Sequence, residues 1–159
     1  MRTLRGHTFM PAPLGPASTV VDLGANVGDF STLIRRSYGC RVIAVEANPQ
    51  LVERVRAIEG VEALHAAVTD RSGEIELMLS DNPEASTVLP GGQGMQLNGS
   101  RVRVPTCTLE EVLAKHAVEH VDLLKVDIEG AEVPVLLSTP EALLRRIDQI
   151  TMEFHDFCG

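Results

Sequence analysis

The feature that most constrains the fold is a glycine-containing turn between a short apolar strand and a helix. Residues 19–23 read Thr-Val-Val-Asp-Leu, a β-branched run typical of a strand, and Gly24-Ala25-Asn26-Val27-Gly28 follows directly. The next residues carry apolar side chains at helical spacing, which predicts a helix from about Asp29 to Ser37 that Gly39 ends. Strand, tight turn and helix N-terminus in this order form the nucleotide-binding corner of open α/β sheets.

Strand and helix patterns alternate along the remaining chain. Further strands are predicted at residues 41–46, 61–68, 121–127 and 150–155, and helices begin at Pro49, at the capping box of Thr108 and Glu111, and after Gly130. Residues 74–79 and 101–105 alternate in polarity and are predicted to pair antiparallel, on either side of an irregular loop over 81–100. This order predicts a Rossmann-like α/β fold, with a mainly parallel sheet and helices on both faces.

Length and charge limit the domain organisation and the partners. The 159 residues suit one domain, which we place at 19–159 after a lead-in segment, 1–18, that shows no periodicity. The net charge of −8 argues against a nucleic-acid partner and against an anionic membrane surface. No apolar run is long enough for a signal peptide or a membrane span, and three dispersed cysteines suggest reduced thiols. We therefore expect a cytoplasmic protein.

The residues around the first turn favour S-adenosylmethionine (AdoMet) over a dinucleotide. A dinucleotide site prefers glycine at the middle of the turn, where this chain has Asn26, and Asp22 would repel a pyrophosphate. A carboxylate at Asp22 suits the α-amino group of AdoMet instead. Glu46 ends the second strand, where a carboxylate can accept hydrogen bonds from both ribose hydroxyls. A nicotinamide cofactor and a domain that binds no cofactor remain as alternatives.

Taken together, three blocks of the chain resemble the FkbM family of AdoMet-dependent methyltransferases. They are Val21-Asp22-Leu23-Gly24-Ala25-Asn26-Val27-Gly28, Val45-Glu46-Ala47-Asn48-Pro49 and, as the most specific, Leu124-Lys125-Val126-Asp127-Ile128-Glu129-Gly130-Ala131-Glu132. The resemblance implies the class I methyltransferase fold and O-methylation of a hydroxyl on a small molecule, such as a macrolide or a sugar. It also implies that Asp22, Gly24, Asn26 and Gly28, together with Ala25 of the same turn, surround the methionyl part of AdoMet, Glu46 the ribose, and Ala47 and Asn48 the adenine edge. Class I enzymes usually continue into a last helix and hairpin, so with an end at Gly159 we expect the C-terminal strands to be missing and a homodimer to be possible.

The candidate catalytic residues follow the last two predicted strands. We expect His155 to be the general base, since its ordinary pKa lies near neutrality, with Asp127 as the second choice. Asp127 could instead cap the following helix, where Glu129 and Glu132 are expected to favour the helix start. Lys125 lies in an apolar strand with the same parity as Asp127, so an ion pair between them is the leading interpretation.

A metal is considered but not predicted. Asp127, Glu153 and His155 could meet at neighbouring strand ends and suit Mg²⁺, although no spacing in the sequence requires it. The other histidines, His7 among them, show no partner pattern and are expected to be solvent-facing or structural. Three functions therefore stay open: a small-molecule O-methyltransferase, a methyltransferase of protein or nucleic acid, and a non-catalytic module that binds AdoMet.

Overall fold

A parallel sheet of five strands forms the centre of the protein. The computed structural model describes residues 1–79 and 100–154. The strand order is β10-β9-β3-β4-β5, and each strand runs parallel to its neighbours. In chain order the strands are β3 (Thr19–Leu23), β4 (Arg41–Glu46), β5 (Val61–His65), β9 (Leu123–Val126) and β10 (Ile150–Met152). The Rossmann-like parallel sheet predicted from the sequence is confirmed.

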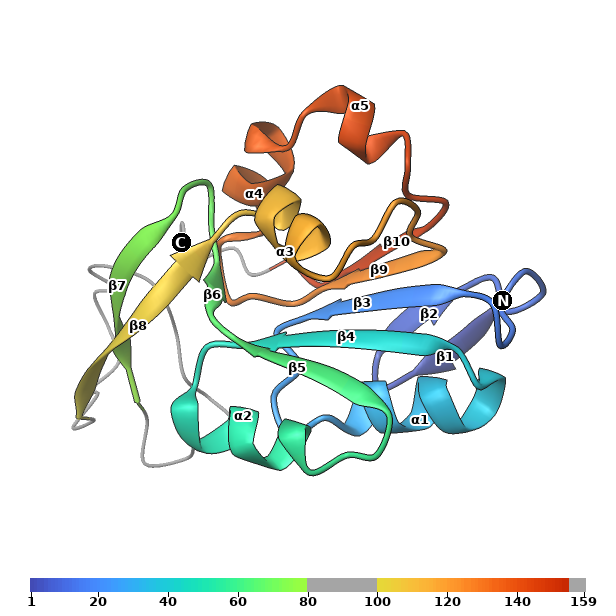
Figure 1. Ribbon diagram of the computed structural model, residues 1–159, viewed down its shortest axis with the longest axis horizontal. Helices are drawn as coiled ribbons and strands as arrows, with labels where there is room; N and C mark the ends of the chain where they lie inside the picture. The colour runs from blue at the N-terminus through green and yellow to red at the C-terminus, as the bar shows by residue number, and fades with distance from the viewer. Residues whose placement is uncertain (80–99, 155–159) are drawn as a thin grey trace.

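Helices cover both faces of this sheet, as predicted. Figure 1 shows α1 (Asp29–Tyr38) and α2 (Pro49–Arg56) on one side, and α3 (Leu109–Lys115), α4 (Glu132–Ser138) and α5 (Glu141–Leu144) on the other. Successive side chains of β3 point to opposite faces of the sheet and pack against the helices on each side. Val20 packs in the same cluster as Phe30 of α1, and Val21 packs in the cluster that includes residues of α3 and α4. Among the described residues, no helix has both the length and the apolar character needed to cross a bilayer.

A second, smaller sheet extends from the end of β5. Its strands are β6 (Ala67–Val68), β7 (Gly73–Met78) and β8 (Arg101–Cys107), in the order β6-β8-β7. The antiparallel pairing of β7 with β8 confirms the prediction, whereas the single strand predicted over 61–68 breaks at Ala66, where the chain leaves the large sheet. The predicted capping box of Thr108 and Glu111 is present at the start of α3. The irregular loop predicted for 81–100 falls, apart from Ser100, outside the described residues.

The N-terminal segment is a β-hairpin, which the sequence pattern did not predict. β1 (Arg2–Leu4) and β2 (His7–Phe9) pair antiparallel around Arg5 and Gly6, whose φ angles of 48° and 85° give the two-residue turn typical of hairpins. The hairpin docks beside β10 through reciprocal hydrogen bonds, because Gln149 accepts from the Met10 N–H at 2.8 Å and donates to the Met10 carbonyl at 3.2 Å. Three-residue strands are too short to show a period, so the segment read as irregular.

Candidate functional site

The carboxyl ends of the parallel strands bring the candidate residues to one edge of the sheet. Glu46 ends β4, Gly24 follows β3, and Asp127 and Glu153 follow β9 and β10. Backbone hydrogen bonds continue past the strands, from the Gly24 N–H to the Val45 carbonyl at 2.9 Å and from the Asp127 N–H to the Leu23 carbonyl at 3.1 Å. This is the edge at which open α/β sheets bind ligands.

The two glycines of the turn are required by the protein's own backbone and packing. Gly24 has φ +76°, and a Cβ there would lie 1.8 Å from the backbone oxygen of Asp127. Gly28 has φ +83°, and its Cβ would lie 2.3 Å from Cδ1 of Ile58. Protein contacts alone therefore favour glycine at both positions, since a side chain at either one meets protein atoms.

Glu46 closes the turn from the neighbouring strand. Its carboxylate is buried and accepts two backbone hydrogen bonds at 2.7 Å, one from the Asn26 N–H and one from the Asn48 N–H. Burial raises the pKa of Glu46, although the two N–H donors act in the opposite direction. Each carboxylate oxygen has more than one lone pair, so this side chain can still accept hydrogen bonds from hydroxyl groups.

A cavity lies beside Glu46, between the ends of β3, β4 and β9. Of the residues predicted to bind the cofactor, Gly24, Asn26, Glu46 and Ala47 line this cavity. The rest of its wall consists of Val45, Ala66, Ala67, Val68, Ile128, Glu129 and the candidate base Asp127. The sequence pattern did not indicate Ala66, Ala67 and Val68 as part of the site. The run of small apolar residues from Ala66 to Val68 was the available signal, but it was taken as the continuation of a strand.

A second cavity lies on the other side of the turn, toward the hairpin. It shares Gly24, Asn26 and Asp127 with the first cavity, and its wall also includes Ala25, Arg5, His7, Val27, Asp29, Phe30 and Lys125. Asp127 therefore stands where the two cavities adjoin. A cofactor in one cavity and an acceptor in the other would both reach this aspartate.

Asp22 faces Lys125 and lines neither cavity. The Asp22 carboxylate is fully buried, lies 3.0 Å from the Lys125 ammonium and accepts a hydrogen bond of 2.7 Å from Ser31. Lys125 donates to the Gly24 carbonyl at 2.8 Å and lies 3.6 Å from Asp127. The predicted ion pair of Lys125 with Asp127 is confirmed, and the closer pair with Asp22 was not foreseen.

This arrangement bears on the expected role of Asp22. Burial by itself would lower the pKa of Lys125, but the charges of Asp22 and Asp127 outweigh it and raise that pKa. The raised pKa favours the charged form of Lys125, which pairs with Asp22 of β3 and so connects β3 to β9 below the turn. In this geometry Asp22 contacts Lys125 and Ser31, and its direct contact with the AdoMet amino group stays a prediction.

Two further residues that were predicted to bind the cofactor have structural roles. Gly28 and Asn48 line neither cavity. The Asn48 side chain accepts a hydrogen bond of 2.9 Å from the Gln50 N–H and so caps α2. Their contacts with the cofactor stay predictions.

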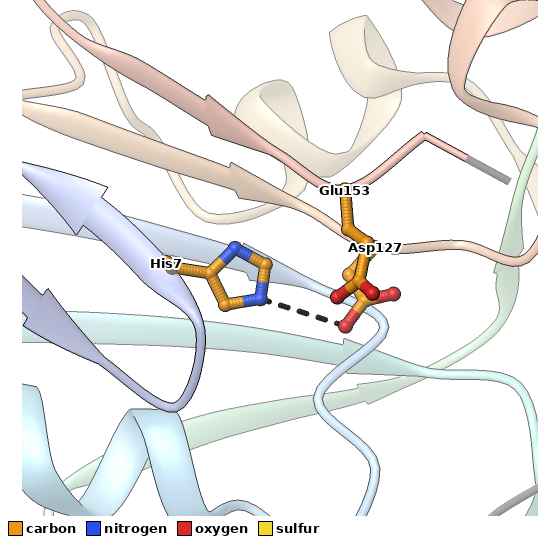
Figure 2. Close-up of side chains that lie close together, drawn as sticks. All are labelled: His7, Asp127 and Glu153. Carbon is orange, nitrogen blue, oxygen red and sulfur yellow. Dashed lines mark ion pairs between the residues drawn. The ribbon is translucent and has the colours of Figure 1, made fainter.

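Asp127 and Glu153 do meet at the strand ends, and His7 joins them. Figure 2 shows the three side chains pointing toward one another, with the His7 Nε2 3.5 Å from the Asp127 carboxylate. His7, expected to be solvent-facing or structural, is buried and faces Asp127, a pairing that no sequence pattern indicated. The N-cap of α4 is Ala131, without a side-chain cap, so the alternative role of Asp127 as the cap of this helix is not observed. His155 falls outside the described residues, so its meeting with Asp127 stays a prediction.

Glu132 binds the backbone of the loop between β9 and α4. This is close to its expected role at the start of the helix. It is the first residue of α4, and its buried carboxylate accepts hydrogen bonds from the N–H groups of Ile128, at 3.1 Å, and Gly130. Glu129 adopts a positive φ of 51° just before Gly130. The motif from Lys125 to Glu132 therefore forms a hydrogen-bonded loop that places Asp127 at the edge of the sheet.

Comparison with known proteins finds a family match and several relatives. The methyltransferase FkbM domain matches residues 22–158. AMB antimetabolite synthetase AmbE of Pseudomonas aeruginosa is 29% identical over 90% of this chain and 9% of its own length. The methyltransferase sdnD of Sordaria araneosa is 27% identical, over 92% of this chain and 70% of the relative. The 31-O-demethyl-FK506 methyltransferase FkbM of Streptomyces tacrolimicus is 28% identical, over 92% and 68%. The chain thus spans a small part of the synthetase and about two thirds of the two methyltransferases.

Proposed function

This chain belongs to the FkbM family of methyltransferases, and from that premise we propose that it transfers a methyl group from AdoMet to a hydroxyl oxygen of a small molecule. The observation that carries the proposal is the pair of adjoining cavities on either side of the Gly24–Asn26 turn, at the ligand-binding edge of the sheet. The acidic balance of the chain supports a small acceptor rather than a nucleic acid. The name of the Streptomyces relative, which specifies an oxygen acceptor, supports a hydroxyl.

AdoMet is assigned to the cavity beside Glu46. The carboxylate accepts the ribose hydroxyls, and the small side chains of Ala47, Ala66 and Ala67 leave room for the flat adenine. Gly24, Ala25 and Asn26 would hold the methionyl part, next to Asp127 at the boundary between the cavities. AdoMet would supply the methyl group there, and the second cavity would hold the acceptor.

The chemical step is an in-line displacement by the acceptor oxygen. Holding two reactants in line contributes on the order of 7–11 kcal/mol, whereas a general base adds about 10²–10⁴-fold, so alignment is the larger contribution. For the base we propose His155 first and Asp127 second. Asp127 lines both cavities, which places it within reach of an acceptor hydroxyl.

Two measurements test the proposal in sequence. Calorimetric titration should show one AdoMet site per chain and no binding of NAD⁺, since only the former cofactor suits this turn. Radiolabelled AdoMet should then methylate members of a hydroxyl panel, and matched amines should stay unlabelled. No AdoMet binding by the folded protein would refute the cofactor assignment. Binding followed by transfer to amines alone would refute the acceptor class.

The base assignment is tested with two variants. His155→Ala should lower the transfer rate by about 10²–10⁴-fold while the AdoMet affinity stays close to that of the unmodified protein. Asp127→Asn keeps the shape of the side chain and removes its charge. Loss of activity in the asparagine variant alone would move the base to Asp127, and full activity in both would leave alignment as the whole of catalysis.

A further inference from the structure

His7, Asp127 and Glu153 form a compact cluster from three separate elements. One imidazole nitrogen and one oxygen from each carboxylate lie within 4.8 Å of one another (Figure 2). The histidine begins β2 of the N-terminal hairpin, while the carboxylates follow β9 and β10. The hairpin precedes the region that matches the family domain, at residues 22–158, so the family match says nothing about His7.

The His7 imidazole is buried and aims at the carboxylates without a hydrogen bond. The side chain is 4% exposed, and over residues 1–79 and 100–154 neither ring nitrogen forms a hydrogen bond. The distance of 3.5 Å from Nε2 to Asp127 exceeds the 2.7–3.2 Å typical of an N–H···O bond. The imidazole lines the second cavity and faces the Asp127 and Glu153 carboxylates at separations longer than a hydrogen bond, an arrangement that suits three ligands around one ion.

The side chains near the cluster carry an excess of negative charge that a divalent cation would balance. The Asp22 and Asp127 carboxylates share the Lys125 ammonium, which lies 3.0 Å from the first and 3.6 Å from the second. Glu153 adds another carboxylate that faces the same small space as Asp127. Two carboxylates this close repel each other unless a cation or a shared proton lies between them.

We propose that His7, Asp127 and Glu153 bind one divalent cation of the Mg²⁺ and Mn²⁺ class. Carboxylate oxygens suit both ions, and the single imidazole favours Mn²⁺. With metal–ligand bonds of about 2.1 Å, ligand atoms on one ion stand about 3 Å apart when adjacent and about 4.2 Å when opposite. The observed separations therefore need only a small inward movement. Three protein ligands leave open positions for an acceptor.

The location of the cation suggests a role for it in the proposed methyl transfer. This role is the one part of the inference that rests on the proposed function. Asp127 and His7 both line the second cavity, so the ion would lie at the wall of the acceptor site. A divalent cation there would bind the acceptor hydroxyl, lower its pKa and hold it in line with the methyl group. Binding of the ion itself depends only on the three side chains.

Manganese binding to the protein without AdoMet or acceptor tests the site. Electron paramagnetic resonance of free Mn²⁺ should show one ion bound per chain, and Mg²⁺ should displace it. His7→Gln and Glu153→Gln should each weaken Mn²⁺ binding by at least about tenfold. Glu153 is exposed at the surface, so its variant should fold even if the buried His7 position tolerates substitution poorly.

A second cluster in the same chain supplies the matched control. His120, Asp122 and Asp148 also lie within ligand distance, but their partners are already present: His120 hydrogen-bonds Asp148 at 3.1 Å and Asp122 accepts from the Thr19 N–H at 2.7 Å. His120→Gln should leave Mn²⁺ affinity unchanged. Electron spin-echo modulation from an imidazole nitrogen should be present in the unmodified protein and absent in His7→Gln.

The outcomes separate this site from the proposed function. The absence of saturable Mn²⁺ binding up to about 1 mM, the weak end of biological calcium sites, would overturn the proposal. So would nitrogen modulation that survives in His7→Gln, or affinity lost in His120→Gln. Each of these results leaves AdoMet binding, measured by calorimetry, unaffected. Conversely, Mn²⁺ binding without AdoMet binding would refute the proposed function and retain the metal site.

Discussion

The buried pair of Asp22 and Lys125 gives a test of whether the aspartate acts on the framework or directly on the cofactor. Lys125→Met keeps the length of the side chain and its packing beside Phe30, 5.9 Å from the ammonium, but removes the charge. Asp22 would remain fully buried, and Ser31 would be its hydrogen-bond partner among residues 1–79 and 100–154. Removing one partner of a buried ion pair costs about 3–5 kcal/mol, because the other charge is left uncompensated.

That cost should be easy to measure by unfolding. For a domain of this size, each kcal/mol lowers Tm by about 2–4 °C, so the variant should melt about 6–20 °C below the unmodified protein. Urea denaturation followed by circular dichroism gives the free energy directly. The double variant Asp22→Asn with Lys125→Met removes both charges, and it should recover part of the loss with a coupling energy of about 0.5–3 kcal/mol.

AdoMet titration of the double variant then decides the role of Asp22. If the aspartate acts through Lys125 and the turn, the double variant should recover affinity together with stability. If Asp22 holds the AdoMet amino group directly, stability would recover while affinity stayed lost. A Lys125→Met variant within about 1 kcal/mol of the unmodified protein would refute the reasoning altogether, since that cost lies well below the range for a broken buried pair.

Three further changes test other parts of the site. Glu46→Gln should raise the AdoMet dissociation constant about 10- to 150-fold, equivalent to about 1.5–3 kcal/mol, and an unchanged constant in calorimetry would contradict the ribose assignment. Because burial raises the pKa of Glu46, the affinity of the unmodified protein should fall on acidification at a pH above the usual glutamate range. Gly24→Ala should lower stability by about 2–6 kcal/mol in thermal melts even without AdoMet, because its Cβ meets the Asp127 carbonyl. The pKa of Glu62 is lowered to about 2 by its hydrogen bond from Arg41, so the stability it contributes above about pH 4.5 should be lost as the pH falls through about 2. Acid titration of Glu62→Gln should lack that loss, and an identical acid transition in both proteins would argue against it.

Local patterns in the sequence were sufficient to predict the architecture and to predict the edge of the sheet at which the site lies. The β-branched run before Gly24, the helical spacing after it and the return of both patterns predicted a parallel sheet covered on both faces, as observed. The capping box at Thr108 and the position of Glu46 at a strand end also follow from neighbouring residues. These features depend on the period of a strand or helix and on turn chemistry, which are local properties.

The pairing of side chains from distant elements could not be read in that way. Asp22 and Lys125 are far apart along the chain, and they meet because β3 and β9 are adjacent with those residues in register. His7 reaches Asp127 because a hairpin too short to show a period docks beside β10. Strand order and hairpin docking depend on how much surface the whole domain buries. A short segment of the sequence does not carry that information.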